Sequence, residues 1–147
     1  MSDLIQTYLP NVYKIGLWGE DGWFMATYTT LYMTIWAFLI GGLIGLLTGL
    51  FLVLTAPGGV LENKFIFQIL DKVTSVFRAI PFIILLFILA PVTYFLIKTN
   101  LGPTAAIVPL SVATFAFFTR QVQVVLSELD RGVIEAAQAS GATTFDL

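Results

Sequence analysis

The stretch from Arg131 to Leu147 has the residue pattern that most directly suggests a function. Glu135 is followed by Ala136 and Ala137, and Gly141 comes shortly after them. On a short helix the Glu135 carboxylate would be available to a basic partner, and the small alanines would permit close approach. Gly141 can end such a helix in a left-handed conformation. The pattern predicts docking of another protein, although an ordinary solvated helix is the reading that the physics alone favours.

The residue types present give little support for catalysis or metal binding. The sequence has no cysteine and no histidine. Cys/His metal sites, histidine-based triads and imidazole general bases are therefore excluded. No Gly-x-x-x-x-Gly-Lys-Ser/Thr loop is present to bind a nucleotide. We expect no enzyme activity, no metal, no cofactor and no nucleic-acid partner.

The composition indicates a chain that is embedded in a lipid bilayer. Hydrophobic residues make up 58% of the 147 residues and charged residues only 11%. A soluble domain has about 25% charged residues, so this chain has too few to cover a water-exposed surface. We expect an all-α, polytopic membrane protein in the cell (plasma) membrane.

Stretches without charge locate the predicted spans. Forty residues separate Asp21 from Glu62, nineteen separate Arg78 from Lys98, and twenty-one separate Lys98 from Arg120, all without a charge. A bilayer core needs roughly 20 apolar helical residues, whose backbone groups must bond within the helix. The sequence predicts three transmembrane helices after a short external N-terminal segment, residues 1–26, at about 27–54, 79–97 and 104–119.

Two amphipathic stretches flank the spans. Residues 60–77 mix charged and apolar groups, which predicts a helix on the membrane surface or against a neighbouring subunit. Residues 121–130 extend the third span into the cytoplasm. The distribution of lysine and arginine favours an external N-terminus and a cytoplasmic C-terminus. Inside would lie Lys64, Lys72, Arg78, Arg120 and Arg131, and outside only Lys14 and Lys98.

Glycines recur every fourth residue in the first predicted span. Gly41, Gly45 and Gly49 would share one helix face, with Gly42 beside them. Small residues at this spacing let a second helix approach closely, which predicts a helix-packing surface. The alternative is the general tolerance of membrane helices for glycine.

Prolines lie within or at the edges of the second and third spans, at Pro81, Pro91 and Pro109. Each removes a backbone donor and disturbs the preceding turn. Broken helices often line transport paths, so Pro81 and Pro109, with the neighbouring Arg78, are candidates for the path. Harmless kinks are an equal alternative, and Pro81 also fits the start of a helix.

No ionisable residue lies inside the predicted spans. Their polar groups are hydroxyls, which we expect mostly to bond carbonyls of their own helix, at Thr34, Thr48, Thr93, Ser111 and Thr114. Ion-coupled transporters usually need a charged group at membrane depth. The absence favours a transporter driven by ATP hydrolysis in another subunit.

Three local patterns together resemble the permease subunits of ABC importers for methionine, the MetI-like proteins. Residues 77–86, Phe-Arg-Ala-Ile-Pro-Phe-Ile-Ile-Leu-Leu, resemble the opening of their second core helix, and residues 105–110 resemble the start of the third. Glu135-Ala-Ala followed by Gly141 resembles the EAA loop of the wider superfamily. The first pattern is the one that narrows the resemblance to the methionine branch. The resemblance covers the chain from about residue 28 onward.

The resemblance implies partners and a mechanism. Such permeases have five membrane helices, pair with a second permease copy as a homodimer, bind cytoplasmic ABC ATPase subunits and receive substrate from an extracellular substrate-binding protein. Glu135, Ala136, Ala137 and Gly141 would lie at the ATPase contact, so that closure of the ATPase switches the path by alternating access. Because three of five helices are present and the EAA loop lacks its Ile-x-Leu-Pro ending, we expect a C-terminally truncated or partial product.

Three alternatives are weighed against this function. A small three-helix scaffold or channel would work without an ATPase, and a non-functional fragment of a permease would not work at all. A membrane enzyme has little support, because the carboxylates are confined to loops and tails.

Overall fold

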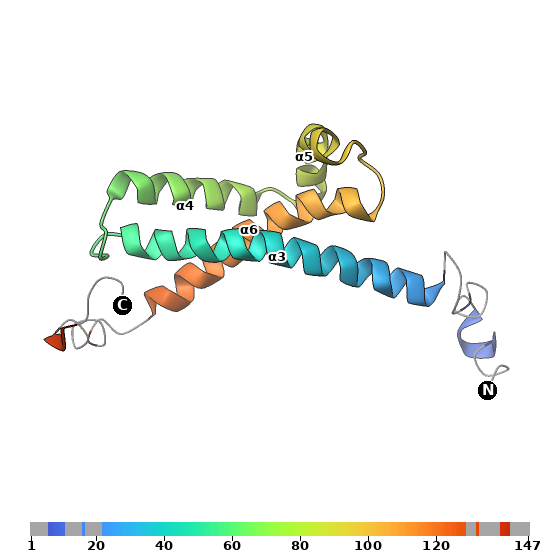
Figure 1. The fold of residues 1–147 in the computed structure, drawn as a ribbon, viewed down its shortest axis with the longest axis horizontal. Helices are drawn as coiled ribbons and strands as arrows, with labels where there is room; N and C mark the ends of the chain where they lie inside the picture. The colour runs from blue at the N-terminus through green and yellow to red at the C-terminus, as the bar shows by residue number, and fades with distance from the viewer. Residues whose placement is uncertain (1–5, 11–15, 17–21, 129–131, 133–138, 142–147) are drawn as a thin grey trace.

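The computed structural model describes residues 6–10, 16, 22–128, 132 and 139–141. Four helices account for most of this part of the chain, and no strand occurs in it, so the all-α prediction is confirmed. They are α3 (Trp23–Thr55), α4 (Lys64–Ala79), α5 (Phe82–Ile97) and α6 (Pro103–Ser127). Figure 1 shows α3 as the long axis of the molecule, with α4 beside it and α6 crossing it.

Helix α3 is apolar on every side, as a membrane-crossing helix must be. Its 33 residues correspond to about 50 Å, more than a hydrocarbon core of about 30 Å requires. The hydroxyls of Thr34 and Thr48 donate to the carbonyls of Thr30 and Ile44, each at 2.8 Å. Of the five span hydroxyls expected mostly to bond within their own helices, those of Thr34 and Thr48 do so, whereas Ser111 Oγ on α6 is buried without a hydrogen-bond partner among the described residues.

A tight reversal sends the chain back along α3. The Leu61 amide donates to the Leu54 carbonyl at 2.9 Å, and the Asn63 amide donates to the Thr55 carbonyl at 3.1 Å. The Asn63 side chain then caps α4 by accepting from the amides of Phe65 and Ile66, both at 3.2 Å. Helix α4 consequently runs beside α3 in the opposite direction (Figure 1). The sequence predicted a helix here but not this course alongside the first span.

The junction of α4 and α5 is a sharp bend of 112°. Ile80 is extended, as expected for a residue before proline, and Pro81 follows as the N-cap of α5. Pro81 therefore separates two helices, and its carbonyl accepts from the amides of Ile84 and Leu85. By length and composition, α3 and α6 can each cross a membrane, and α4 with α5 supplies a third crossing only as one bent pair.

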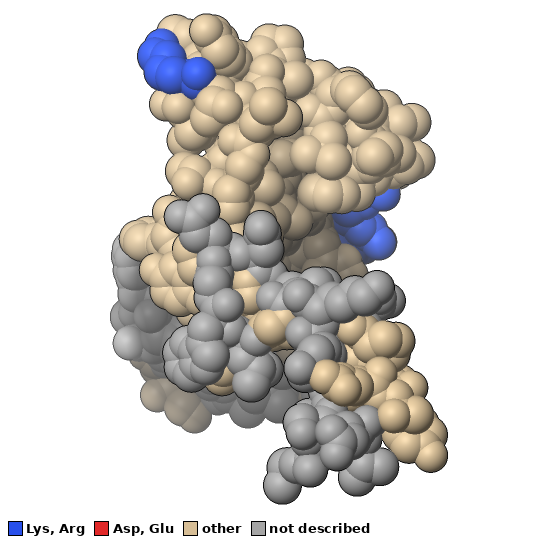
Figure 2. Space-filling model, turned by 90° about the vertical axis from the view of Figure 1, so that its right-hand side faces the viewer, with Lys and Arg blue, Asp and Glu red and all other residues tan. Residues whose placement is uncertain are grey.

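The remaining prolines lie inside helices, Pro91 in α5 and Pro109 in α6. Pro109 is fully buried, whereas most large apolar side chains of α3 and α5 are exposed. Phe87 and Phe95 of α5, for example, are 75% and 72% exposed. In Figure 2 the described atoms of one face are almost all neither acidic nor basic. A surface of this kind is suited to lipid or to other membrane helices.

Candidate functional site

The predicted ATPase-coupling residues lie mostly outside the described part of the chain. Glu135, Ala136 and Ala137 are among the residues that the structure does not describe. Gly141 is described, and its φ of +87° is in the left-handed region that glycine adopts without strain. No described residue lies within 4 Å of the position that a Cβ would take on Gly141. A side chain at this position would meet backbone strain.

The glycine surface of α3, formed by Gly41, Gly45 and Gly49, lies directly against α6. A Cβ built on Gly45 would be 2.9 Å from the Phe115 carbonyl oxygen, and one on Gly49 would be 2.8 Å from that of Thr119. At Gly41 the same atom would collide with the carbonyl oxygen of Ser111. The obstacle at each glycine includes backbone, which cannot move aside as a flexible side chain can.

Gly42 differs from its three neighbours in the same helix. A Cβ there would meet only the ring of Phe38, at 3.7 Å, which is ordinary van der Waals contact. The close approach of α3 and α6 thus depends on one helix face, the face that the four-residue spacing identifies. The sequence did not reveal that α6 is the helix that packs there.

Arg78 lies at the bend, where α4, α5 and α6 enclose a half-open cavity of about 250 Å³. Its aromatic lining comes from Phe77, Phe82 and Phe117, one from each of the three helices. Arg78 is exposed, and the structure records no ion pair or hydrogen bond for it among the described residues. A guanidinium without an anion among the described residues, in a half-open cavity, can receive an anionic group.

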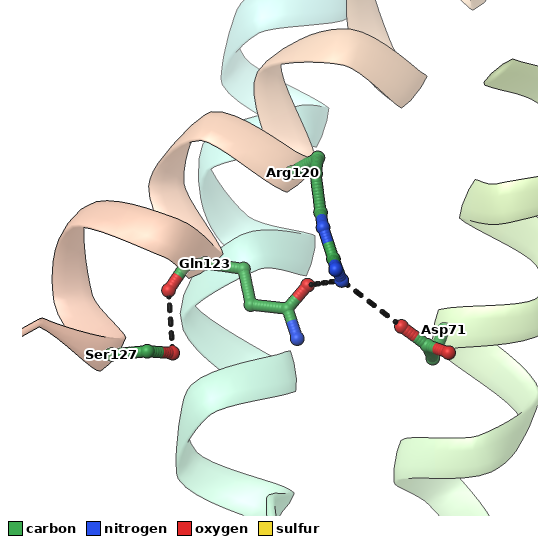
Figure 3. A network of polar contacts seen from close by, with 4 residues as sticks. All are labelled: Asp71, Arg120, Gln123 and Ser127. Carbon is green, nitrogen blue, oxygen red and sulfur yellow. Dashed lines mark hydrogen bonds and ion pairs between the residues drawn. The ribbon is translucent and has the colours of Figure 1, made fainter.

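A network of polar side chains, which includes an ion pair, joins α4 to α6 (Figure 3). Arg120 Nη1 lies 3.3 Å from Asp71 Oδ1 and donates to Gln123 Oε1 at 2.7 Å. Ser127 then donates to the Gln123 carbonyl oxygen at 2.7 Å. Sequence reasoning missed this group because Asp71 and Arg120 are 49 positions apart. Only the antiparallel course of α4 brings them together.

Two buried hydroxyls have no hydrogen-bond partner within the described residues. They are Thr74 Oγ1 on α4 and Ser111 Oγ on α6. Among the described residues there is also no cluster of three or more acidic residues that could hold a metal ion.

The sequence was compared with models of known protein families to identify the family of this chain. A model described as "Binding-protein-dependent transport system inner membrane component" matches residues 41–147. This chain belongs to that family. The matched region begins at Gly41, so it includes all three glycines that meet α6, the α4–α5 bend and the stretch predicted to couple to an ATPase. The chain is thus an integral, multi-pass membrane component of a transport system.

Individual members of this transport family with similar sequences include two methionine permeases. The probable D-methionine transport system permease protein MetI of Pasteurella multocida is 45% identical over 123 residues, covering 84% of this chain and 57% of the relative. The methionine import system permease protein MetP of Bacillus subtilis is 42% identical over 141 residues, covering 96% and 61%. The chain therefore spans about three-fifths of the length of these relatives.

Solved structures of the same transport family share the fold. Two inward-facing structures of the MetNI methionine ABC transporter match with TM-scores of 0.76 and 0.77, each at 40% sequence identity. The match covers 80% of this chain and 55% of the other chain. The arrangement of helices in Figure 1 is therefore similar to that in about half of the matched chain of that transporter.

Proposed function

We propose that this chain forms part of the membrane-spanning subunit of an ATP-driven importer for methionine or a related amino acid. The observation that carries the proposal is the likeness to methionine permeases in sequence and fold together, at 40–45% identity and TM-scores of 0.76–0.77. The chain supplies the path through the bilayer, and an ABC ATPase subunit hydrolyses ATP. A second permease copy completes the path, and an extracellular substrate-binding protein delivers the amino acid.

Residues 131–147 form the ATPase contact in this proposal. Helix α6 supports it, because α6 packs against α3 and ends at Ser127, only four residues before this segment in the sequence. A rigid helix between the two can transmit a movement of the ATPase to the α3–α6 pair. The pair would then move as one body during alternating access.

The docking role of Glu135 is tested by charge reversal. The chain is produced in the full reading frame of its gene, together with the ATPase, and the bound ATPase is measured by co-purification. Glu135→Lys should lower ATPase recovery about tenfold while membrane insertion is unchanged. The matched control is Glu128→Lys, which reverses an exposed carboxylate just after α6 and outside the predicted contact. Equal recovery with both variants would contradict the assignment of the loop.

Gly141 provides a second test that depends on backbone conformation. Gly141→Val should weaken co-purification because valine is strained at a φ of +87°. Gly141→Asn should be tolerated better, because asparagine enters the left-handed region more readily. Equal losses with both would mean that side-chain volume at the contact matters and the turn does not.

The N-terminus lies outside in the proposed orientation, with the α3–α4 turn and the end of α6 in the cytoplasm. Lys64, Lys72 and Arg120 lie towards that cytoplasmic side, whereas Lys98 ends α5. Single cysteines at Leu101 and Leu61, both exposed, report the two sides. A membrane-impermeant thiol reagent added to intact cells should label Leu101→Cys and spare Leu61→Cys. The reverse pattern would invert the orientation.

A further inference from the structure

The cavity at the α4–α5 bend lies at the level of the middle of α3. Its wall on α6 includes Ala113 and Phe117. Gly41, near the middle of α3, faces Ser111 and Thr114 of α6, and Gly45 faces Phe115. Along α6, the residues that line the cavity therefore alternate with the residues that contact the glycines of α3. The cavity consequently lies at the same level along α3 as these glycines.

This level is far from both ends of α3. Gly45 is ten residues from the end of α3 at Thr55, which is about 15 Å along a helix, and Gly41 is farther than that from Trp23. A hydrocarbon core is about 30 Å thick. If α3 spans the bilayer, Arg78 approaches its central region. The sequence had suggested instead that the arginine marks the cytoplasmic edge.

An arginine at membrane depth needs an anion or water nearby. Charged residues within a membrane face the protein interior or a water-filled cavity, and they mark substrate pathways. Asp71, an acidic residue of α4, pairs with Arg120. Arg78 has no such partner among the described residues and lines a half-open cavity. The site has the charge and the access to receive an anion from outside the protein.

The surrounding side chains indicate the rest of the ligand. Phe77, Phe82 and Phe117 give the cavity three aromatic rings, and the small Ala113 also lines it. A guanidinium binds a carboxylate through two parallel hydrogen bonds. A thioether makes favourable contacts with aromatic ring edges. The cavity of about 250 Å³ is suited to a molecule the size of an amino acid.

We propose that this cavity is a transit site for the transported amino acid, with Arg78 binding its carboxylate and the phenylalanine rings contacting its apolar side chain. The inference rests on the proposed importer function and adds the binding residues within it. A lipid phosphate offers Arg78 a similar charge, but phosphates lie outside the hydrocarbon core, away from this level. An amino acid crossing the bilayer must pass the level at which the cavity lies.

The absence of cysteine from the sequence makes a direct test possible. Ala113→Cys places one thiol in the cavity of the complex with its ATPase, and Leu101→Cys, at an 83% exposed position outside the cavity, is the reference. Rates are measured in detergent with an anionic and a cationic methanethiosulfonate reagent. The anionic-to-cationic rate ratio at Ala113→Cys should exceed that at Leu101→Cys by about tenfold, because Arg78 attracts the anion.

Adding a second substitution on α4 to Ala113→Cys shows which side chain causes the preference for the anionic reagent. Arg78→Gln should abolish it and Arg78→Lys should retain it. Lys72→Gln removes a cation of the same helix that does not line the cavity, and it should change little. A preference that survives Arg78→Gln would overturn the role of Arg78.

Protection identifies the ligand. Methionine at millimolar concentration should slow the reaction of Ala113→Cys, and methioninol, which has a hydroxyl in place of the carboxylate, should not. Equal protection by both would overturn carboxylate recognition. Protection by phosphatidylglycerol vesicles without any effect of methionine would show a lipid site and overturn the transit site.

Methionine uptake and ATPase co-purification are measured separately on the parent protein, without the introduced cysteine. Loss of both would sink the proposed function. If methionine uptake and ATPase co-purification are both observed but the cysteine shows no preference for the anionic reagent, only the proposal of the transit site is wrong.

Discussion

The α3–α6 crossing and the arm formed by α4 and α5 are held in place by different means. At the crossing, Gly41, Gly45 and Gly49 bring α3 within contact of α6 backbone. The arm is fixed by a capped turn, one ion pair and the bend after Ile80. Backbone contact leaves a helix pair little freedom to separate, whereas a bent arm with an exposed ion pair can change position at small cost.

This difference matches what an alternating-access transporter needs. One part must carry movement from the ATPase without deforming, and another must open and close a path. We assign the first part to the α3–α6 pair and the second to the α4–α5 arm, which also holds Arg78. Three experiments test the contrast, from the largest expected effect to the smallest.

The crossing should be the more sensitive region. Gly41→Ala places a methyl group against the Ser111 carbonyl and should lower the free energy of unfolding by about 1–3 kcal/mol. Gly42→Ala adds the same group to the adjacent residue, where the nearest atom is 3.7 Å away, and should be close to neutral. Thermal denaturation of the detergent-solubilised complex compares them. Equal effects would show that the crossing does not depend on this helix face.

The start of the arm should show a smaller effect. Asn63→Ala removes the side-chain oxygen that accepts from the amides of Phe65 and Ile66, and should cost about 1 kcal/mol of stability. Asn63→Ser keeps a capping oxygen and should retain most of that stability. The same denaturation measurement applies. If serine is no better than alanine, the cap does not hold the arm.

The ion pair should contribute least. Asp71 and Arg120 are 36% and 41% exposed, so solvent screens their attraction. A double-mutant cycle with Asp71→Asn and Arg120→Gln should give a coupling energy of about 0.2–1 kcal/mol. Strictly additive effects of the two substitutions would show that the pair does not tie α4 to α6. Raised salt should shrink the coupling further.

The two regions also differ in how far the sequence reveals them. Long charge-free runs and four-residue glycine spacing are local patterns, and they indicate α3, α6 and the face of α3 that packs. The predicted spans 27–54 and 104–119 correspond to α3 at Trp23–Thr55 and α6 at Pro103–Ser127. The glycine spacing cannot predict which helix packs against it, because the α6 residues that contact the glycines lie about 70 positions later in the sequence.

The arm was harder to predict because its form depends on distant contacts. Mixed charged and apolar residues over 60–77 indicate an amphipathic helix, but the same pattern suits a membrane surface and a protein groove. The packing of α4 beside α3 and the pairing of Asp71 with Arg120 instead depend on residues far away in the sequence. The position of Arg78 at the cavity between α4, α5 and α6 follows from that packing, so the residue's neighbours in sequence could not show it.

Methionine uptake tests the central claim most directly. A cell without its own methionine importers receives the full reading frame of this gene with the genes for the ATPase and the substrate-binding protein. The importer function predicts uptake of radiolabelled methionine that is lost when the P-loop lysine of the ATPase is replaced. Full expression and ATPase co-purification without methionine uptake would contradict it, and so would uptake that survives the loss of that lysine.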